Sequence, residues 1–163
     1  MLCLVFSDSH GNSRNMEIAL SKNRSCEVVF FLGDGLSDIS GIIPKYPTIS
    51  FICVRGNCDS TYALSLVNVP DTDSVTLLGK RIVLTHGHLF GAKSGEGGLI
   101  SLAKKTEADI LLFGHTHEEQ EKYVSGDRPF YLFNPGSISG CSPTYGVINI
   151  TESGILLSHG TVK

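Results

Sequence analysis

Short, mostly apolar segments alternate with polar turns along the first part of the chain. Apolar segments of this length with little alternation are typical of strands that are buried on both faces of a sheet. Such strands are expected over residues 2–6, 27–32, 48–54 and 110–113. Helical segments are expected over residues 12–22, over residues 37–43 before Pro44, and over residues 99–106.

The pattern changes after about residue 70, where paired strands replace the strand–helix alternation. Residues 73–78 and 81–85 flank Gly79 and Lys80, which predicts a hairpin. Further strands are expected over residues 120–124, 130–133, 146–150 and 155–158. Buried strands with helices, followed by antiparallel hairpins, predict an α/β fold: a four-layer α-β-β-α sandwich of two mixed β-sheets flanked by helices. Residues 1–163 are expected to form a single domain.

Composition and charge exclude several classes of protein. The chain has 163 residues, of which 41% are hydrophobic and 18% charged, which disfavours disorder and coiled coil. No apolar segment approaches the roughly 18–20 residues that span a bilayer, and residues 1–6 are too short and lack the basic start of a secretory signal. The net charge of −3 makes a nucleic-acid partner unfavourable.

The cysteines indicate a reducing environment. There are five, an odd number, and none form a C-x-x-C pair, so neither a disulfide framework nor a thiolate zinc site is indicated. A cytoplasmic location is therefore expected. The sequence leaves open whether the protein forms a homo-oligomer.

Candidate chemistry gathers where the predicted strands end. Five strands each lead into a glycine-containing turn that carries side chains able to bind a metal ion: Asp8, His10, Asp34, Asn57, His86, His115 and His117. Five of the six histidines lie in these turns. In open α/β sheets, ligands bind outside the carboxyl ends of the strands, so these side chains are expected to converge.

Each motif also has a structural interpretation when it is taken alone. Asp8 and Asp34 could satisfy backbone N–H groups in turns, and Asn57 could adopt the left-handed conformation that asparagine tolerates. His86 and His88 could be one buried and one exposed histidine. Their succession at five strand ends favours a metal site instead.

The donor atoms indicate which ions would bind. Carboxylate and amide oxygens together with imidazole nitrogens suit Mn²⁺, Fe, Zn²⁺ or Ni²⁺, and do not suit a structural cysteine–zinc site. Seven ligands exceed what one ion needs, whereas two ions that share a bridging carboxylate would use them well. Paired ions about 3.5–4 Å apart activate water and neutralise a phosphoryl transition state.

The ordered motifs resemble the calcineurin-like metallophosphoesterase superfamily. They are Asp8-x-His10, Gly33-Asp34, Gly56-Asn57-x-Asp59, His86 and Gly114-His115-x-His117. The sequence is most similar to the small bacterial and archaeal phosphodiesterase branch, as judged from residues 56–59, 85–91 and 133–137. The resemblance extends from Asp8 to Ser137 and implies the sandwich fold described above.

The resemblance also implies roles for individual residues. Asp8, His10 and His117 would hold a first ion, and Asn57, His86 and His115 a second, with Asp34 and a water or hydroxide bridging both. The cofactor would be two divalent ions, Mn²⁺ before Fe, Ni²⁺ or Zn²⁺. The implied activity is a metal-dependent phosphodiesterase, in which metal-bound hydroxide attacks a small phosphodiester in line, with Asp34, Asn57, Cys58 and His86 in the catalytic set.

Cys58 departs from the monoesterase pattern, in which many relatives have histidine after the Gly-Asn pair. A thiol is a poorer hydrogen-bond donor than imidazolium, so stabilisation of the departing oxygen should be weaker. Phosphodiesters or activated esters are therefore expected as substrates rather than alkyl monoesters. Asp59 is expected to orient a neighbour or to close the turn.

Three other interpretations remain. The superfamily includes a retromer subunit that keeps the fold for protein binding, so a catalytically silent scaffold is the main alternative. A metallo-β-lactamase-like hydrolase is prompted by His115-x-His117, but Glu118 follows where that family requires a further ligand motif. A redox sensor at Cys58 is the third.

The glycine-rich residues 91–98 are expected to border the site. Lys93 in this segment would either meet substrate phosphate or form part of a solvated connector.

Overall fold

A computed structural model describes residues 1–60 and 68–163 and contains two five-stranded sheets. The first sheet has the order β10-β9-β1-β2-β3, formed by Gly154–Thr161, Thr144–Thr151, Leu2–Phe6, Cys26–Phe31 and Ser50–Cys53. The second has the order β4-β5-β6-β8-β7, formed by Thr72–Leu77, Lys80–Thr85, Ile110–Leu112, Phe130–Pro135 and Glu119–Val124.

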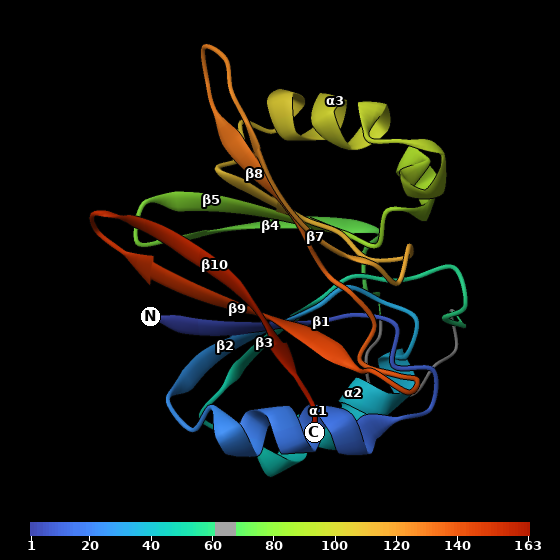
Figure 1. Ribbon diagram of the computed structural model, residues 1–163. Helices are drawn as coiled ribbons and strands as arrows, with labels where there is room; N and C mark the ends of the chain where they lie inside the picture. Colours follow the sequence, from blue (N-terminus) through green and yellow to red (C-terminus); the bar gives the residue numbers. More distant parts are fainter. Residues whose placement is uncertain (61–67) are drawn as a thin grey trace.

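The two sheets stack face to face between helical layers (Figure 1). Helices α1 (Ser13–Lys22) and α2 (Leu36–Ile42) cover the outer face of the first sheet, and α3 (Gly97–Lys105) covers that of the second. Short 3₁₀ helices are η1 (Ile43–Lys45), η2 (His88–Phe90) and η3 (Ala92–Ser94). The predicted four-layer sandwich of two mixed sheets is confirmed.

Strand direction explains why one edge of the sandwich collects the polar turns. Strands β1, β2 and β3 are mutually parallel, as are β5, β6 and β8. Parallel strands end at the same edge of their sheet, so the turns that follow them become neighbours. The remaining pairings, β1–β9, β9–β10, β4–β5 and β7–β8, are antiparallel.

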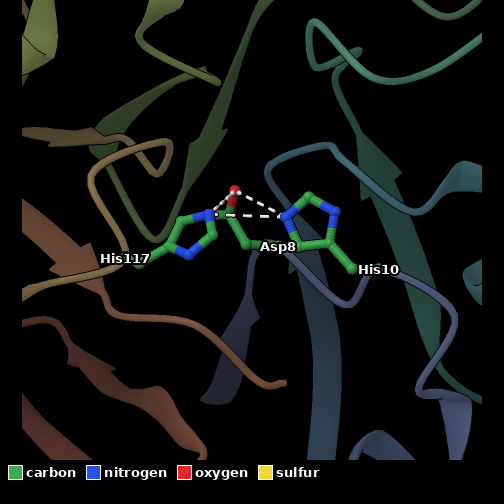
Figure 2. Close-up of side chains that lie close together, drawn as sticks. All are labelled: Asp8, His10 and His117. Atoms are coloured by element: carbon green, nitrogen blue, oxygen red, sulfur yellow. Dashed lines mark hydrogen bonds and ion pairs between the residues drawn. The ribbon is translucent and has the colours of Figure 1, made fainter. Parts of the chain in front are cut away.

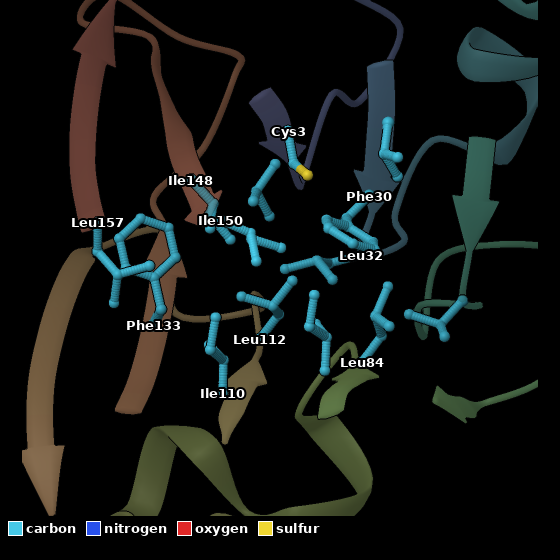
Figure 3. Packing of buried hydrophobic residues seen from close by; sticks show 14 residues of the cluster. Cys3, Phe30, Leu32, Leu84, Ile110, Leu112, Phe133, Ile148, Ile150 and Leu157 are labelled. Atoms are coloured by element: carbon cyan, nitrogen blue, oxygen red, sulfur yellow. The ribbon is translucent and has the colours of Figure 1, made fainter. Parts of the chain in front are cut away.

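The main core fills the space between the sheets (Figure 3). Phe30 and Ile148 of the first sheet pack in one cluster with Leu84, Leu112 and Phe133 of the second, and all five are fully buried. Full burial of a side chain of this size contributes about 1.5–3 kcal/mol. Two smaller clusters join α1 and α2 to the first sheet and α3 to the second. The helices and sheets therefore hold the polar edge rigidly.

Most predicted boundaries differ from the structure by one to three residues, and two of these differences change a turn or a loop. The hairpin turn is Leu78-Gly79 rather than Gly79-Lys80, because Leu77 pairs with Lys80. Both turn residues have positive φ, 48° and 74°, as expected for the tight turn that matches strand twist. Helix α3 begins at Gly97, so the end of the predicted glycine-rich loop is helical. Among the described residues, no helix has the length and apolar character needed to cross a membrane.

Candidate metal centre

The structure brings all of the sequence-predicted site residues to one edge of the sandwich. Asp8 and His10 follow β1, Asp34 follows β2, and Asn57 and Cys58 follow β3 in the first sheet. His86 follows β5, and His115 and His117 follow β6 in the second sheet. The donor atoms fall into overlapping groups within 4.8 Å of one another: Asp8, His10 and His117; His10, Asp34 and Cys58; and Asp34, His86 and His115.

The first group surrounds one carboxylate oxygen of Asp8 (Figure 2). Asp8 Oδ1 lies 3.1 Å from His117 Nε2 and 3.8 Å from His10 Nε2, and these two nitrogens are 3.4 Å apart. The other oxygen, Oδ2, accepts hydrogen bonds from Ser7 Oγ at 2.6 Å and from the His115 backbone N–H at 3.1 Å. Asp8 is thereby fixed with Oδ1 directed toward the two imidazoles.

Asp8 Oδ1 is a buried acceptor that receives no hydrogen bond from the described residues. His117 Nε2 is close enough, but its approach lies outside hydrogen-bond geometry. A buried carboxylate oxygen without a donor is costly unless a cation is its partner. This atom therefore fits a bound metal ion better than it fits an ordinary hydrogen-bond network.

The third group, with Asp34 and His115, is built around His86, whose side chain is fully buried. Its Nδ1 donates to the Leu32 carbonyl oxygen at 2.7 Å, which orients the ring and leaves Nε2 facing the site. Nε2 lies 3.4 Å from Asp34 Oδ2 and 3.1 Å from Asn57 Oδ1. The His115 ring is 5.0 Å from that of His86, centroid to centroid. One nitrogen and two oxygens thus converge beside a second imidazole.

The charges of this group are strongly coupled. Burial alone would raise the pKa of Asp34, but hydrogen bonds from His86 and from the Cys58 backbone N–H hold it well below its usual range. Burial alone would lower the pKa of His86, but Asp34 and Asp8 raise it above its ordinary value. Burial and the charges of His86 and Lys93 lower the pKa of His115. The carboxylates therefore favour a cation at this place, whether a proton or a metal ion.

Backbone conformation at the site is also unusual. Positive φ occurs at eight described residues other than glycine, and five of these are sequence-predicted ligands: Asp8, His10, Asp34, His115 and His117. Their φ angles lie between 43° and 69°. Such conformations cost about 1–3 kcal/mol each and persist where the surrounding structure enforces them, commonly at functional sites. The strained turns direct these side chains away from the sheets toward a common centre.

Asp59 holds the turn that carries Asp34. Its two carboxylate oxygens accept four backbone N–H groups, those of Asp34, Gly35, Leu36 and Gly56, each at 2.8 Å. Gly56 packs so closely that a Cβ there would lie 2.1 Å from Asp34 Oδ1. Asp59 was expected either to orient a neighbour or to close the turn, and its hydrogen bonds to Asp34 and Gly56 do both.

A family comparison agrees with this geometry. A family model described as a calcineurin-like phosphoesterase superfamily domain matches residues 1–153. The chain belongs to this superfamily. The resemblance inferred from the motifs is therefore confirmed.

Individual relatives are similar over different lengths. Phosphodiesterase YfcE of Escherichia coli strain K12 is 37% identical over 108 residues, which covers 60% of this chain and 52% of YfcE. The chain therefore aligns with about half the length of that superfamily member.

Two solved structures align over nearly the whole chain. A predicted phosphoesterase from Streptococcus pneumoniae aligns with a TM-score of 0.78 and 29% identity, over 98% of this chain and 88% of that one. Vps29 from Entamoeba histolytica, solved in complex with zinc, aligns with a TM-score of 0.75 over both whole chains at 20% identity. This last likeness concerns the fold alone.

One side of the candidate metal centre is open to solvent. The His10 and His117 side chains are 34% and 46% exposed, and Asn57 and Cys58 are exposed as well. Beside them is a hollow of about 700 Å³. It is lined by Ala92, Lys93, Gly95, Glu96, Thr116, Glu118, Glu119 and Gln120. Residues 92–96 thus face the turn that carries His115 and His117.

The structure adds supporting hydrogen bonds around the centre that were not predicted. Ser7 donates to Asp8, and Asp38 accepts from Ser9 Oγ at 2.6 Å and from the Gly11 backbone N–H at 2.8 Å. Asn134 Nδ2 donates to the Gly114 carbonyl at 3.1 Å and to Thr116 Oγ1 at 3.0 Å. The signal that could have identified Ser7 is a polar residue directly after a continuously apolar strand. Asp38 offers no such signal because its partners are distant in sequence.

Proposed function

We propose that the protein is a metal-dependent phosphodiesterase that holds two divalent ions, with Mn²⁺ the first candidate and Fe, Ni²⁺ or Zn²⁺ the others. The observation that carries the proposal is the donor set: ligand atoms fall into three overlapping groups, two of which contain Asp34, and the buried Asp8 Oδ1 has no donor among the described residues. Superfamily membership and the phosphodiesterase name of YfcE support the same reaction. Zinc in the Vps29 structure supports metal binding by this fold.

Each group of residues at the centre would have its own role in hydrolysis. Two divalent ions would supply charge that activates water and offsets the developing charge on phosphorus oxygens. One ion would be held by Asp8, His10 and His117. The other would be held by Asn57, His86 and His115, and Asp34 would contribute to both. The exposed face formed by His10, His117 and Asn57 would admit a small phosphodiester from solvent. A hydroxide derived from water would attack phosphorus in line with the leaving group.

Direct hydrolysis is favoured over a covalent phospho-enzyme. Cys58 is the thiol beside the centre, and its pKa is raised above the ordinary value by its hydrogen bond to Asp34, by burial and by nearby carboxylates. A protonated thiol is a weak nucleophile. Oxygen-18 from water should therefore appear in the phosphate product after one turnover, whereas a phosphorylated side chain would contradict this mechanism.

The main alternative is a catalytically silent scaffold of the same fold. The observation that favours this alternative is the structural alignment with Vps29 along the whole chain. Loss of metal ligands would mark such a protein, whereas all seven expected positions here carry donor side chains that converge. We therefore place the enzyme first.

One experiment separates these two functions. The purified protein is analysed for bound metals, and is then assayed with diesters, monoesters and cyclic nucleotides, with Mn²⁺ and after chelation. The enzyme predicts metal-dependent hydrolysis, with diesters preferred. Protein that binds no metal and stays inert with Mn²⁺, Ni²⁺, Zn²⁺ and Fe²⁺ would support the scaffold.

Remaining expectations concern context. One domain over residues 1–163 stays part of the proposal, and the superfamily model matches residues 1–153 of it. A small molecule is the proposed substrate. The net charge of −3 argues against nucleic acid as the substrate. All five cysteines are unpaired, which supports the cytoplasm as the location. Light scattering of the purified protein would test whether it forms a homo-oligomer.

A further inference from the structure

The structure places the sulfur of Cys58, which was expected at the centre only as part of the catalytic set, close enough to serve as a further metal ligand. Cys58 Sγ lies within 4.8 Å of a ligand atom of His10 and of one of Asp34, which themselves lie within that distance of each other. His10 also belongs to the group with Asp8 and His117, and Asp34 to the group with His86 and His115. The cysteine therefore lies where both groups meet, on the exposed side of the centre.

Two hydrogen bonds fix the cysteine at this place. Its backbone N–H donates to Asp34 Oδ1 at 2.7 Å, and Asn57 Nδ2 lies 3.3 Å from Sγ as a donor. The same Asn57 presents Oδ1 to His86 Nε2 at 3.1 Å, so both ends of its amide have partners in one orientation. Sγ is thus held beside Asp34 rather than turned freely into solvent.

A separate observation points to a cation on the His10 side of this group. Asp8 Oδ1 is fully buried, receives no hydrogen bond from the described residues, and lies 3.8 Å from His10 Nε2 (Figure 2). An ion that binds His10 would also be near this oxygen. The sulfur of Cys58, the imidazole of His10 and the carboxylate of Asp34 therefore form a mixed donor set, which shares His10 with the group that contains Asp8.

Such a set distinguishes between metal ions. Thiolate is a soft ligand that Zn²⁺, Cd²⁺ and Co²⁺ accept readily, whereas Mn²⁺ prefers oxygen and water. We propose that Cys58 Sγ binds thiophilic divalent ions together with His10 and Asp34, and that it stays unligated when the centre holds Mn²⁺. The thiol proton passes to solvent as the metal–sulfur bond forms. This inference rests on the proposed function, because it assigns one more ligand to the same centre.

The consequence is a difference between metal-loaded forms. His10 and Asp34 are expected ligands of the hydrolytic arrangement, and an ion that also binds Cys58 would draw both toward the sulfur. Zinc- or cadmium-loaded protein should therefore be less active than the manganese form. Replacement of the sulfur should remove this difference.

Cobalt provides a direct spectroscopic test. Wild-type protein titrated with Co²⁺ should develop a thiolate-to-cobalt charge-transfer band in the near ultraviolet together with visible d–d bands. Cys58→Ser should lose the charge-transfer band and keep visible bands from the histidine and carboxylate ligands. Cys141→Ser, which removes the other exposed cysteine, should keep both sets of bands.

Calorimetry gives a second, independent measurement. Cys58→Ser should weaken Zn²⁺ binding by at least about tenfold, the lower end of the range for outer-sphere changes, and leave Mn²⁺ binding unchanged. A wild-type d–d spectrum without a charge-transfer band, or a band that survives in Cys58→Ser, overturns the inference and leaves the proposed function standing. Absence of cobalt, zinc and manganese binding overturns both.

Discussion

Asp34 and Asp8 are both buried carboxylates at the centre, but they differ in how many groups of donors they join. Asp34 belongs to the group with His10 and Cys58 and to the group with His86 and His115, whereas Asp8 belongs to one group. Asp34→Asn should therefore reduce kcat/KM more than Asp8→Asn, and by more than the roughly 10–100-fold typical of residues outside the ligand shell. Steady-state kinetics with Mn²⁺ measure both variants, with circular dichroism as the check on folding. Equal losses would contradict a bridging role for Asp34.

Cys58 should set which leaving groups depart readily. Its raised pKa leaves a neutral thiol where an imidazolium would be a strong proton donor. General acid catalysis is typically worth about 10²–10⁴-fold, and is needed most for leaving groups of high pKa. Wild-type protein should therefore hydrolyse nitrophenyl diesters well and alkyl monoesters poorly, and Cys58→His should improve the poor leaving groups selectively.

The measurement for Cys58 is the slope of log kcat against leaving-group pKa. A shallower slope in Cys58→His supports the role, and Cys58→Ser serves as the control of similar size, for which little change is expected. If chemistry limits both enzymes and their slopes agree, Cys58 does not determine the substrate preference.

At the scale of elements, the Asp59 turn joins β2, α2 and β3. Asn at position 59 would place an amide N–H₂ against backbone N–H groups that now donate to a carboxylate. Unsatisfied buried donors cost about 1–3 kcal/mol, so Asp59→Asn should lower the free energy of unfolding by about that amount and weaken Mn²⁺ binding about 10–100-fold. Denaturant unfolding and calorimetry measure the two effects.

Asp38→Asn is the matched control for this prediction. Asp38 uses one oxygen, Oδ2, for both Ser9 Oγ and the Gly11 N–H, and an asparagine oxygen can replace it. A smaller loss is expected at position 38. Losses of the same size at both positions would contradict the special role of the Asp59 carboxylate.

The segment with Lys93 borders the centre from the second sheet. Lys93 lies in η3, lines the hollow next to Thr116, and its charge contributes to the lowered pKa of His115. If it meets substrate phosphate, Lys93→Ala should raise KM about tenfold with little change in kcat, as for loss of one hydrogen bond to a charged group. Lys104→Ala in α3 is the control. Unchanged KM and kcat would reject the role.

Sequence patterns predicted most strands because largely buried segments such as Leu2–Phe6 are continuously apolar, and glycine-containing turns follow them. The site was predictable to the extent that ligands follow parallel strands in order. Two sets of hydrogen bonds could not be predicted: the four backbone N–H groups that donate to Asp59, and the hydroxyl of Ser7 that donates to Asp8. Both depend on contacts that only the tertiary packing determines. The hairpin turn moved by one residue because strand register, rather than the position of glycine alone, decides which two residues form the loop.

For the whole molecule, metal binding and folding should be linked through His86. A ligand that binds the folded state at 100 times its Kd contributes about 2.7 kcal/mol, which for a chain of this size raises Tm by roughly 5–10 °C. Imidazole must lose its proton to coordinate, and the raised pKa of His86 extends this competition above the ordinary histidine value of about 6.5. The Tm increase caused by Mn²⁺ should therefore continue to grow as pH rises above about 6.5.

The metal-free protein should respond to pH in the opposite direction. A histidine whose pKa is raised by folding stabilises the folded state most below its unfolded pKa, and this contribution is lost as pH rises through the folded value. The pKa values of His88 and His115 are lowered in the folded protein, so these two histidines change the stability mainly below about pH 6.5. They do not mask the effect of His86 at higher pH. Thermal unfolding after chelation should thus show Tm falling as pH rises above about 6.5. His86→Gln should remove the part of this fall that lies below the thiol range near pH 8.5, where the raised pKa values of Cys3, Cys26, Cys53 and Cys58 add to it. A chelated wild-type protein whose Tm is flat or rises over that range would show that His86 does not hold a proton in the place of a metal ion.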